Sequence, residues 1–317
     1  MIYIAIAAGI LLLLLLWYIY SIRWCYNYVF SRKSSRGPQN SSGKADEKKA
    51  LAKEKHKKQM EELRSLSHDD VSVTSYDGLR LEGKFFPASD SKSTVIIFHG
   101  YRSNLCADSS LITKHCLERG FNVLAVHQRA HGESEGQTIT FGVRERIDCK
   151  SWVDYTVSRI GSDSRIMLMG VSMGASTVMM ASDLDIPNVY GIFADCGFSS
   201  PKEILKVVIK SLSYPVGLAY HVVRAGAILF GGFDPEKESA EKSLANSSIP
   251  ITIIHSETDS YVPCYMAKKC FDAAKAEKKK LVIIPEAAHA YSYFYETEIY
   301  ESALDEMLDS VKNKRNT

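Results

Sequence analysis

Ser172 lies at the centre of a Gly-x-Ser-x-Gly pentapeptide that directly follows the apolar run 165–169. A small-residue pattern typical of a helix continues over 175–182. A strand, a tight turn and a helix in this order place a serine hydroxyl on a strained turn above the edge of a sheet. Gly170 and Gly174 fit this turn because side chains there would collide with a neighbouring strand or helix. An ordinary Gly/Ser turn is the alternative, so the interpretation depends on partners elsewhere in the chain.

A serine hydroxyl becomes a nucleophile when a base removes its proton and a third group orients that base. After a serine on this kind of turn, an acid and then a histidine are expected at the ends of later strands. Asp259 follows the apolar run 249–255, and His289 follows the run 280–284. We therefore predict that Asp259 is the orienting acid and His289 is the general base.

Three other residues compete for these two roles. Glu257 lies in the same loop as Asp259 but nearer the strand, and Asp195 is a second acid at a strand end. His255 lies at the end of a strand, a position more typical of a packed histidine. His289 differs from an ordinary surface histidine only through its place after the last strand.

An acyl-transfer site also needs hydrogen-bond donors for the negative oxygen that develops in the transition state. His99 and Gly100 follow the apolar run 94–98, and a glycine there lets the backbone turn an N–H group toward the site. We predict that the backbone N–H groups of Tyr101 and Met173 form this oxyanion hole. In the alternative, Gly100 only lets the chain turn from strand to loop.

The remaining pattern predicts the elements that position these residues. Short apolar runs alternating with helical patterns are typical of a parallel sheet covered on both faces. The apolar runs are 94–98, 122–126, 165–169, 189–194, 249–255 and 280–284, and the helical patterns are 106–118, 143–160, 173–184 and 264–276. Alternating segments at 71–76 and 79–85 flank an Asp-Gly pair, which predicts an antiparallel hairpin before the parallel sheet.

Residues 200–248 interrupt this alternation. They contain several helical patches and no strand pattern, with more apolar residues than one helix face against a sheet requires. We interpret the segment as a small helical cap inserted between two strands. Additional core helices are the alternative.

The first 22 residues predict a transmembrane anchor. Residues 2–22 carry no charge and are long enough to span a bilayer as a helix. Trp17, Tyr18 and Tyr20 cluster at one end, where aromatic rings favour the headgroup level. A cleaved signal peptide fits less well, because no Lys or Arg precedes the apolar run and no small-x-small site follows it.

The charge distribution predicts the orientation of this anchor. Residues 21–60 contain 11 Lys and Arg against three acidic residues, a net charge of +8. The positive-inside rule places such a segment, and the domain after it, on the cytoplasmic side of the cell membrane. The basic segment is expected to contact anionic lipid, although a merely solvated linker is an equal alternative.

Charge and cysteine usage also limit the partners. Because the whole chain carries +2, everything outside residues 21–60 carries −6, and this acidic body predicts no binding to nucleic acid. The seven cysteines show no Cys-x-x-Cys spacing, which is typical of a reducing compartment and argues against a thiolate zinc site. We predict no metal and no cofactor.

Three segments follow from these patterns. Residues 1–22 are the anchor, 23–69 are a basic juxtamembrane linker and helix, and 70–317 are the catalytic domain with its cap at about 200–248. Within the second segment, residues 34–44 are expected to be a flexible linker and residues 45–66 a charged helix.

The order of these motifs resembles that of the α/β hydrolases. The match rests on His99-Gly100, the loop 129–134, the Ser172 pentapeptide, Asp259 with the following Val-Pro pair, and His289. It is most similar to the bacterial serine aminopeptidase-like and monoacylglycerol-lipase-like branch, over about residues 71–308. The resemblance implies an eight-stranded, mostly parallel sheet, a Ser-Asp-His triad, no cofactor, and hydrolysis of esters, thioesters or amides.

Two positions depart from the pattern of such proteins. His127 stands where Asp is often found, and Ala130 replaces a common Gly. Both belong to the loop beside the oxyanion strand, so they affect the substrate site and leave the triad intact.

The sequence thus predicts a membrane-anchored serine hydrolase that acts on a small acyl ester, a thioester or a short peptide. An acyltransferase with the same triad, or a non-catalytic membrane-anchored binding protein on this fold, are the alternatives.

Overall fold

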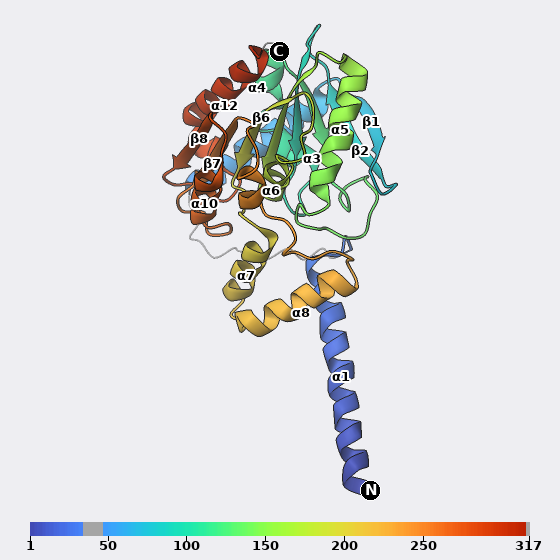
Figure 1. Cartoon of the computed structure of the whole chain (residues 1–317). Helices are drawn as coiled ribbons and strands as arrows, with labels where there is room; N and C mark the ends of the chain where they lie inside the picture. Colours follow the sequence, from blue (N-terminus) through green and yellow to red (C-terminus); the bar gives the residue numbers. More distant parts are fainter. Residues whose placement is uncertain (34–46, 315–317) are drawn as a thin grey trace.

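The computed structural model describes residues 1–33 and 47–314, and an eight-stranded sheet forms its centre (Figure 1). The strand order is β1-β2-β4-β3-β5-β6-β7-β8. The strands are β1 (Asp69–Thr74), β2 (Arg80–Phe86), β3 (Ser93–Phe98), β4 (Asn122–Val126), β5 (Arg165–Val171), β6 (Val189–Asp195), β7 (Ile251–Ser256) and β8 (Lys279–Ile284). β2 pairs antiparallel with β1 and β4, and every other neighbouring pair is parallel. The predicted hairpin leading into a parallel sheet is confirmed.

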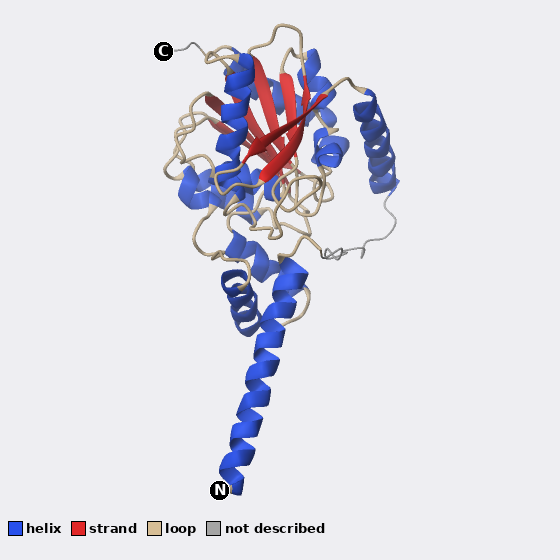
Figure 2. Cartoon of the chain, turned by 90° about the vertical axis from the view of Figure 1, so that its right-hand side faces the viewer, coloured by secondary structure: helices blue, strands red, loops and turns tan. Residues whose placement is uncertain are grey.

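Helices cover both faces of this sheet (Figure 2). They are α1 (Ile2–Val29), α2 (Glu47–Ser65), α3 (Leu105–Ser109), α4 (Thr113–Glu118), α5 (Glu145–Ile160), α6 (Met173–Met180), α7 (Pro201–Ser211), α8 (Val216–Leu229), α9 (Ala240–Leu244), α10 (Tyr265–Ala273), α11 (Ser292–Tyr295) and α12 (Thr297–Lys312). Side chains of β3 alternate between two cores: Ile96 and Phe98 pack in the core of α5, α6 and α10, whereas Val95 and Ile97 pack in that of α3, α4 and α12. Burial on both faces explains the continuous apolar runs in the sequence.

The expected single helix at 106–118 is two short helices, α3 and α4. The hydroxyl of Ser109 donates to the Leu105 carbonyl, and the hydroxyl of Thr113 donates to the Ser109 carbonyl. Such bonds to the carbonyl four residues earlier slightly destabilise a helix and often bend it, which favours the interruption between α3 and α4. The apolar pattern alone did not reveal this interruption.

Of the predicted cap segment between β6 and β7, helices α7 and α8 form a cap, whereas α9 packs in the main core with Ala240 and Leu244 buried. Helices α7 and α8 project beyond the carboxyl ends of the strands (Figure 1). They leave Leu212, Leu218 and Leu229 exposed, which an additional pair of core helices would not do.

Helix α1 extends beyond the predicted anchor, to Val29 instead of residue 22. Tyr26 and Phe30 are buried against the domain, so residues 23–33 are not a linker. Arg23 lies within the helix, and its guanidinium lies over the ring of Phe230, 4.7 Å from the ring centroid. The predicted flexible linker at 34–44 lies outside the described residues, and α2 falls within the predicted charged helix at 45–66.

Candidate active site

Ser172 forms the turn between β5 and α6. Its φ of 54° and ψ of −114° are a strained conformation for a residue with a side chain. A Cβ on Gly170 would lie 2.2 Å from the Gly174 carbonyl carbon, and a Cβ on Gly174 would lie 1.9 Å from the Phe98 oxygen. Both glycines are therefore required by close backbone approach, which is the reason that the sequence predicted.

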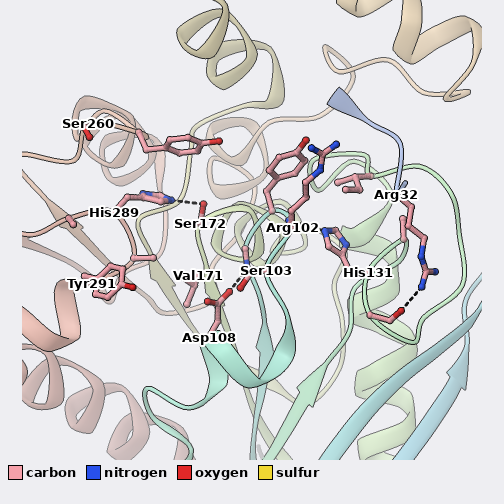
Figure 3. A pocket seen from close by; sticks show the side chains of 18 of the residues that line it. Arg32, Arg102, Ser103, Asp108, His131, Val171, Ser172, Ser260, His289 and Tyr291 are labelled. Carbon is pink, nitrogen blue, oxygen red and sulfur yellow. Dashed lines mark hydrogen bonds between the residues drawn. The ribbon is translucent and has the colours of Figure 1, made fainter. Parts of the chain in front are cut away.

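The structure brings Ser172, His289 and Asp259 into one hydrogen-bonded chain. Figure 3 shows the contact between His289 and Ser172. His289 Nε2 is 2.8 Å from Ser172 Oγ, and its Nδ1 is 2.6 Å from Asp259 Oδ2. Because a carboxylate only accepts, Nδ1 is the donor in that bond, and Nε2 of the neutral ring is left to accept the serine proton. This is the arrangement that a general base requires.

Asp259 is held as an ionised acceptor. Its Oδ1 accepts the N–H groups of Tyr261 at 2.8 Å and Val262 at 2.9 Å, and its side chain is fully buried. Burial alone would raise the pKa of Asp259, but the hydrogen bonds and charges of His255 and His289 outweigh it and hold that pKa well below the usual range. The acid thus stays charged while it orients His289.

The competing residues take other positions. Glu257 is exposed to solvent, away from this chain of hydrogen bonds. His255 is buried and bonds through Nε2 to the Val262 carbonyl at 2.8 Å, so it packs behind Asp259 as expected of a packed histidine. Asp195 is buried and accepts the hydroxyl of Tyr300 at 3.1 Å, and burial raises its pKa to about 6. Neither Asp195 nor Glu257 contacts His289 through a hydrogen bond between described residues.

The loop after β3 passes directly beside the serine. A Cβ on Gly100 would lie 3.4 Å from Ser172 Cβ. Within the described residues, the backbone N–H groups of Tyr101 and Met173 donate to no other group, which leaves them available for an oxyanion. The two predicted donors thus flank Ser172 with their hydrogen-bonding capacity unused.

Two side chains hold that loop in place. The buried carboxylate of Asp108 accepts the Gly100 N–H at 2.6 Å, although burial raises the pKa of this acid. His99 accepts the Gln128 N–H at Nε2, 3.2 Å away, so its Nδ1 donates to the Gly100 carbonyl at 2.7 Å. The sequence indicated His99 as a residue that supports this loop. It did not indicate Asp108, because no spacing rule links this acid to a loop eight residues earlier.

The loop containing the two unusual residues keeps a compact shape. Ala130 adopts a left-handed φ of 61°, a conformation that Gly adopts without strain. The ring of His127 lies against Gly132, where a Cβ would be 2.3 Å from the ring. His131 of the same loop accepts the Arg102 N–H at 3.1 Å and lines the site.

Two cavities meet at Ser172. One, of about 800 Å³, has a mixed lining that includes the polar side chains of His289, Arg102 and His131, and we call it the polar cavity (Figure 3). The other, of about 650 Å³, is lined mostly by apolar side chains of α1, α7 and α8. The sequence did not predict these cavities, because their walls come from segments far apart in the chain.

One cluster has the composition of a metal site. Ligand atoms of Cys196, Asp259 and His289 lie within 4.8 Å of one another. However, Asp259 and His289 are hydrogen-bonded to each other, and burial raises the pKa of the Cys196 thiol well above its usual value. A thiol held in its protonated form is a poor ligand, so the chemistry of this cluster fits a proton relay better than metal binding.

A serine on a strained strand-to-helix turn, at the carboxyl edge of an eight-stranded and mostly parallel sheet, defines the α/β hydrolases. Residues 29–206 match the X-Pro dipeptidyl-peptidase (S15) family, and the chain belongs to this family. The protein is therefore a hydrolase.

Relatives and solved structures agree with this class. The chain is similar to the uncharacterized protein YqkD of Bacillus subtilis, with 27% identity over 76% of this chain and 79% of YqkD. The Pyrococcus furiosus esterase PF2001 superposes with a TM-score of 0.65 and 25% identity, over 77% of this chain and 91% of the esterase. The polyketide transferase GrgF of Penicillium sp. is 28% identical over 38% of this chain and 42% of its own length, and its structure gives a TM-score of 0.59.

Proposed function

We propose that the protein is a serine hydrolase that cleaves an acyl ester, a thioester or an amide through Ser172, His289 and Asp259. The observation that carries the proposal is the unbroken hydrogen-bonded chain from Ser172 Oγ through His289 to Asp259, with its serine on a strained turn. A nucleophile, a base within hydrogen-bond reach and an orienting acid are the parts that acyl transfer requires.

In the proposed reaction, His289 Nε2 takes the Ser172 proton as Oγ attacks the acyl carbonyl carbon. The resulting oxyanion accepts the N–H groups of Tyr101 and Met173, and Asp259 stabilises the imidazolium. His289 then gives its proton to the leaving group, and an acyl-enzyme remains at Ser172. Water, deprotonated by the same histidine, releases the acid and restores the serine.

A fluorophosphonate probe tests this assignment. We expect the unchanged protein to be labelled on Ser172 and the Ser172→Ala variant to be unlabelled. Ser260→Ala is the matched control, because this exposed serine lines the same polar cavity, and its side chain takes no part in the hydrogen bonds between Ser172, His289 and Asp259. Absence of labelling in the unchanged protein, or equal labelling of Ser172→Ala, would contradict the proposal.

We further propose that α1 anchors the enzyme as a single-pass helix in the cell membrane, with the catalytic domain on the cytoplasmic side. Among the described residues, α1 is the one helix long and apolar enough to cross a bilayer, a property shared by signal sequences. Burial of Tyr26 and Phe30 in the domain holds the inner end of α1 against the catalytic domain. The +8 charge of residues 21–60 favours the orientation and contact with anionic lipid.

Membrane vesicles of known orientation test the anchor. We expect the intact chain to resist extraction at high pH, and protease to digest the catalytic domain only from the cytoplasmic face. A mature protein whose mass lacks the first 20 or so residues would favour the signal-peptide alternative.

An acyltransferase is the second candidate, favoured by the similarity to the polyketide transferase GrgF. In that case an alcohol or amine would replace water in the second half of the reaction. Product analysis with added acceptors separates the two: free acid as the sole product supports hydrolysis, and acylated acceptor supports transfer. A non-catalytic binding protein would require a broken relay, and the 2.8 Å contact of His289 with Ser172 removes the reason to prefer it.

A further inference from the structure

The carboxyl-terminal end of α1, next to the catalytic domain, forms one wall of the apolar cavity beside Ser172. Trp24, Cys25 and Tyr28 of α1 line it on one side, and Val208 and Ala219 of the cap line it on another. Ser172 lines this cavity and also borders the polar cavity. The reactive hydroxyl is thus reached from two chemically different spaces.

The position of His289 decides which part of a substrate occupies each space. His289 borders the polar cavity and not the apolar one. In the proposed mechanism this histidine protonates the leaving group, so the leaving group must lie in the polar cavity. The acyl group, on the other side of the scissile bond, then extends into the apolar cavity.

Helix α1 is fixed in place as part of this cavity. A Cβ on Gly226 of α8 would lie 2.9 Å from the Ile22 carbonyl oxygen, so the two helices cross in close backbone contact. The hydroxyl of Tyr101 donates to the Val29 carbonyl at 2.6 Å. The end of α1 is therefore tied both to the cap and to the residue whose N–H group is the predicted oxyanion donor.

The outer rim of the cavity continues an apolar surface. Leu218 of α8, at the rim, is 70% exposed, and Leu212 and Tyr214 beside it are also exposed. On the α1 side, Trp17 and Tyr20 line the cavity and are exposed as well, at the end of the segment that we place in the bilayer. Aromatic side chains at this level are typical of the membrane interface. With α1 in the bilayer as proposed, this rim would face the lipid.

From this arrangement we propose that α1 is a wall of the acyl-chain site, and that the substrate is a long-chain acyl ester or thioester drawn from the bilayer between α1 and the cap. The inference rests on the proposed function, since it assigns the substrate class of the same serine. A cavity of about 650 Å³ lies within the range of sites for small apolar ligands and suits a flexible alkyl chain. The anchor helix then has a second role, in substrate binding.

Cavity-filling variants of the full-length protein test the proposal. Cys25→Trp fills the cavity from α1, and Ala219→Trp fills it from the cap. Asn27→Trp and His221→Trp are the matched controls, because both residues are exposed, lie two positions away on the same helices and do not line the cavity. Each protein is assayed in detergent with p-nitrophenyl acetate, octanoate and palmitate.

We expect the ratio of kcat/KM for palmitate to that for acetate to fall by about 10-fold or more in both filled variants, because each displaced stretch of alkyl chain loses apolar contact. The ratio should stay within about 2-fold of the unchanged protein in both controls. An unchanged ratio in Cys25→Trp would overturn the role of α1, and equal loss for every chain length would overturn the acyl assignment.

Labelling of Ser172 by a small fluorophosphonate separates these outcomes from other failures. A filled variant labelled to the normal extent is folded and has a working relay, so its chain-length ratio can be interpreted. If the unchanged protein is not labelled, the proposed function fails. If it is labelled but prefers acetate over palmitate, only the inference about α1 and the acyl chain fails.

Discussion

Two regions of the molecule meet at Ser172: the turn that carries this serine, and the apolar surfaces of α1 and the cap. The turn is closely packed, whereas the apolar surfaces are partly exposed. At the turn, a Cβ on Gly174 would lie 1.9 Å from a backbone oxygen, whereas Gly217 of α8 has no heavy atom within 4 Å of such a Cβ. The orienting acid of the relay is fully buried, whereas Leu229 of the cap is 67% exposed. The proposed nucleophile is thus held by close backbone packing, whereas the proposed acyl-chain site is formed by apolar surfaces that are partly exposed.

The two regions should differ most in the effect of losing a histidine. His289→Ala is expected to lower kcat on the order of 10⁶-fold, since the serine loses its base. His221→Ala, in the exposed face of α8, should change kcat by less than about 2-fold. Steady-state hydrolysis of p-nitrophenyl butyrate measures both. Because relay members act as a unit, adding Ser172→Ala to His289→Ala should lower the rate little further, and a multiplicative loss would contradict a single relay.

A single methyl group tests the difference in packing. Gly174→Ala should lower the free energy of unfolding by about 3 kcal/mol or more, because β3 and α6 would have to separate. Gly217→Ala should raise it by about 0.5–1 kcal/mol, since alanine favours a helix and meets no neighbour. Chemical denaturation in detergent provides both values. Similar losses in the two variants would mean that the cap is packed as tightly as the turn.

The buried acid behind the relay makes stability depend on pH. Burial raises the pKa of Asp195 to about 6, so the folded state binds this proton more tightly than the unfolded chain does. The protonated Asp195 carboxyl therefore adds to the free energy of unfolding. This contribution is fully present below pH ~4 and is lost as pH rises through ~6, a change of about 3 kcal/mol. The free energy of unfolding of Asp195→Asn, measured against the unchanged protein at several pH values, should lack this fall. Parallel pH profiles of the two proteins would show that Asp195 titrates normally.

The smallest effect is expected on the outer surface of the cap. Leu229→Ala should change the free energy of unfolding by less than about 0.5 kcal/mol in detergent, because the side chain already faces outward. Leu244→Ala on α9 is the control, since a side chain that is 2% exposed should cost about 2–5 kcal/mol. A loss above about 1 kcal/mol at Leu229 would mean that it packs against protein instead of facing lipid.

The sequence predicted the sheet well because buried strands carry continuous apolar runs, as in β3 and β5. It predicted the spatial meeting of Ser172, Asp259 and His289 because the carboxyl ends of parallel strands share one edge. It failed on the split between α3 and α4, where hydroxyl groups compete with the helix, and on the end of α1. Tyr26 and Phe30 follow a charged residue, so the sequence did not place them in the domain. Only the packing of Phe30 against Phe141 and Phe233, and of Tyr26 against Phe230, shows that they belong to it.

The sequence by itself determined which residues can do chemistry and the order in which the fold presents them. Local rules suffice there, because a strained turn demands glycines beside its serine and strand ends recur at regular places along the chain. Only the tertiary structure decided what surrounds Ser172. The apolar cavity joins α1 to a cap that lies about 200 residues later, and Asp108 reaches the site from α3 whereas His131 reaches it from a loop. Contacts between such distant segments depend on packing in three dimensions, which no local pattern records.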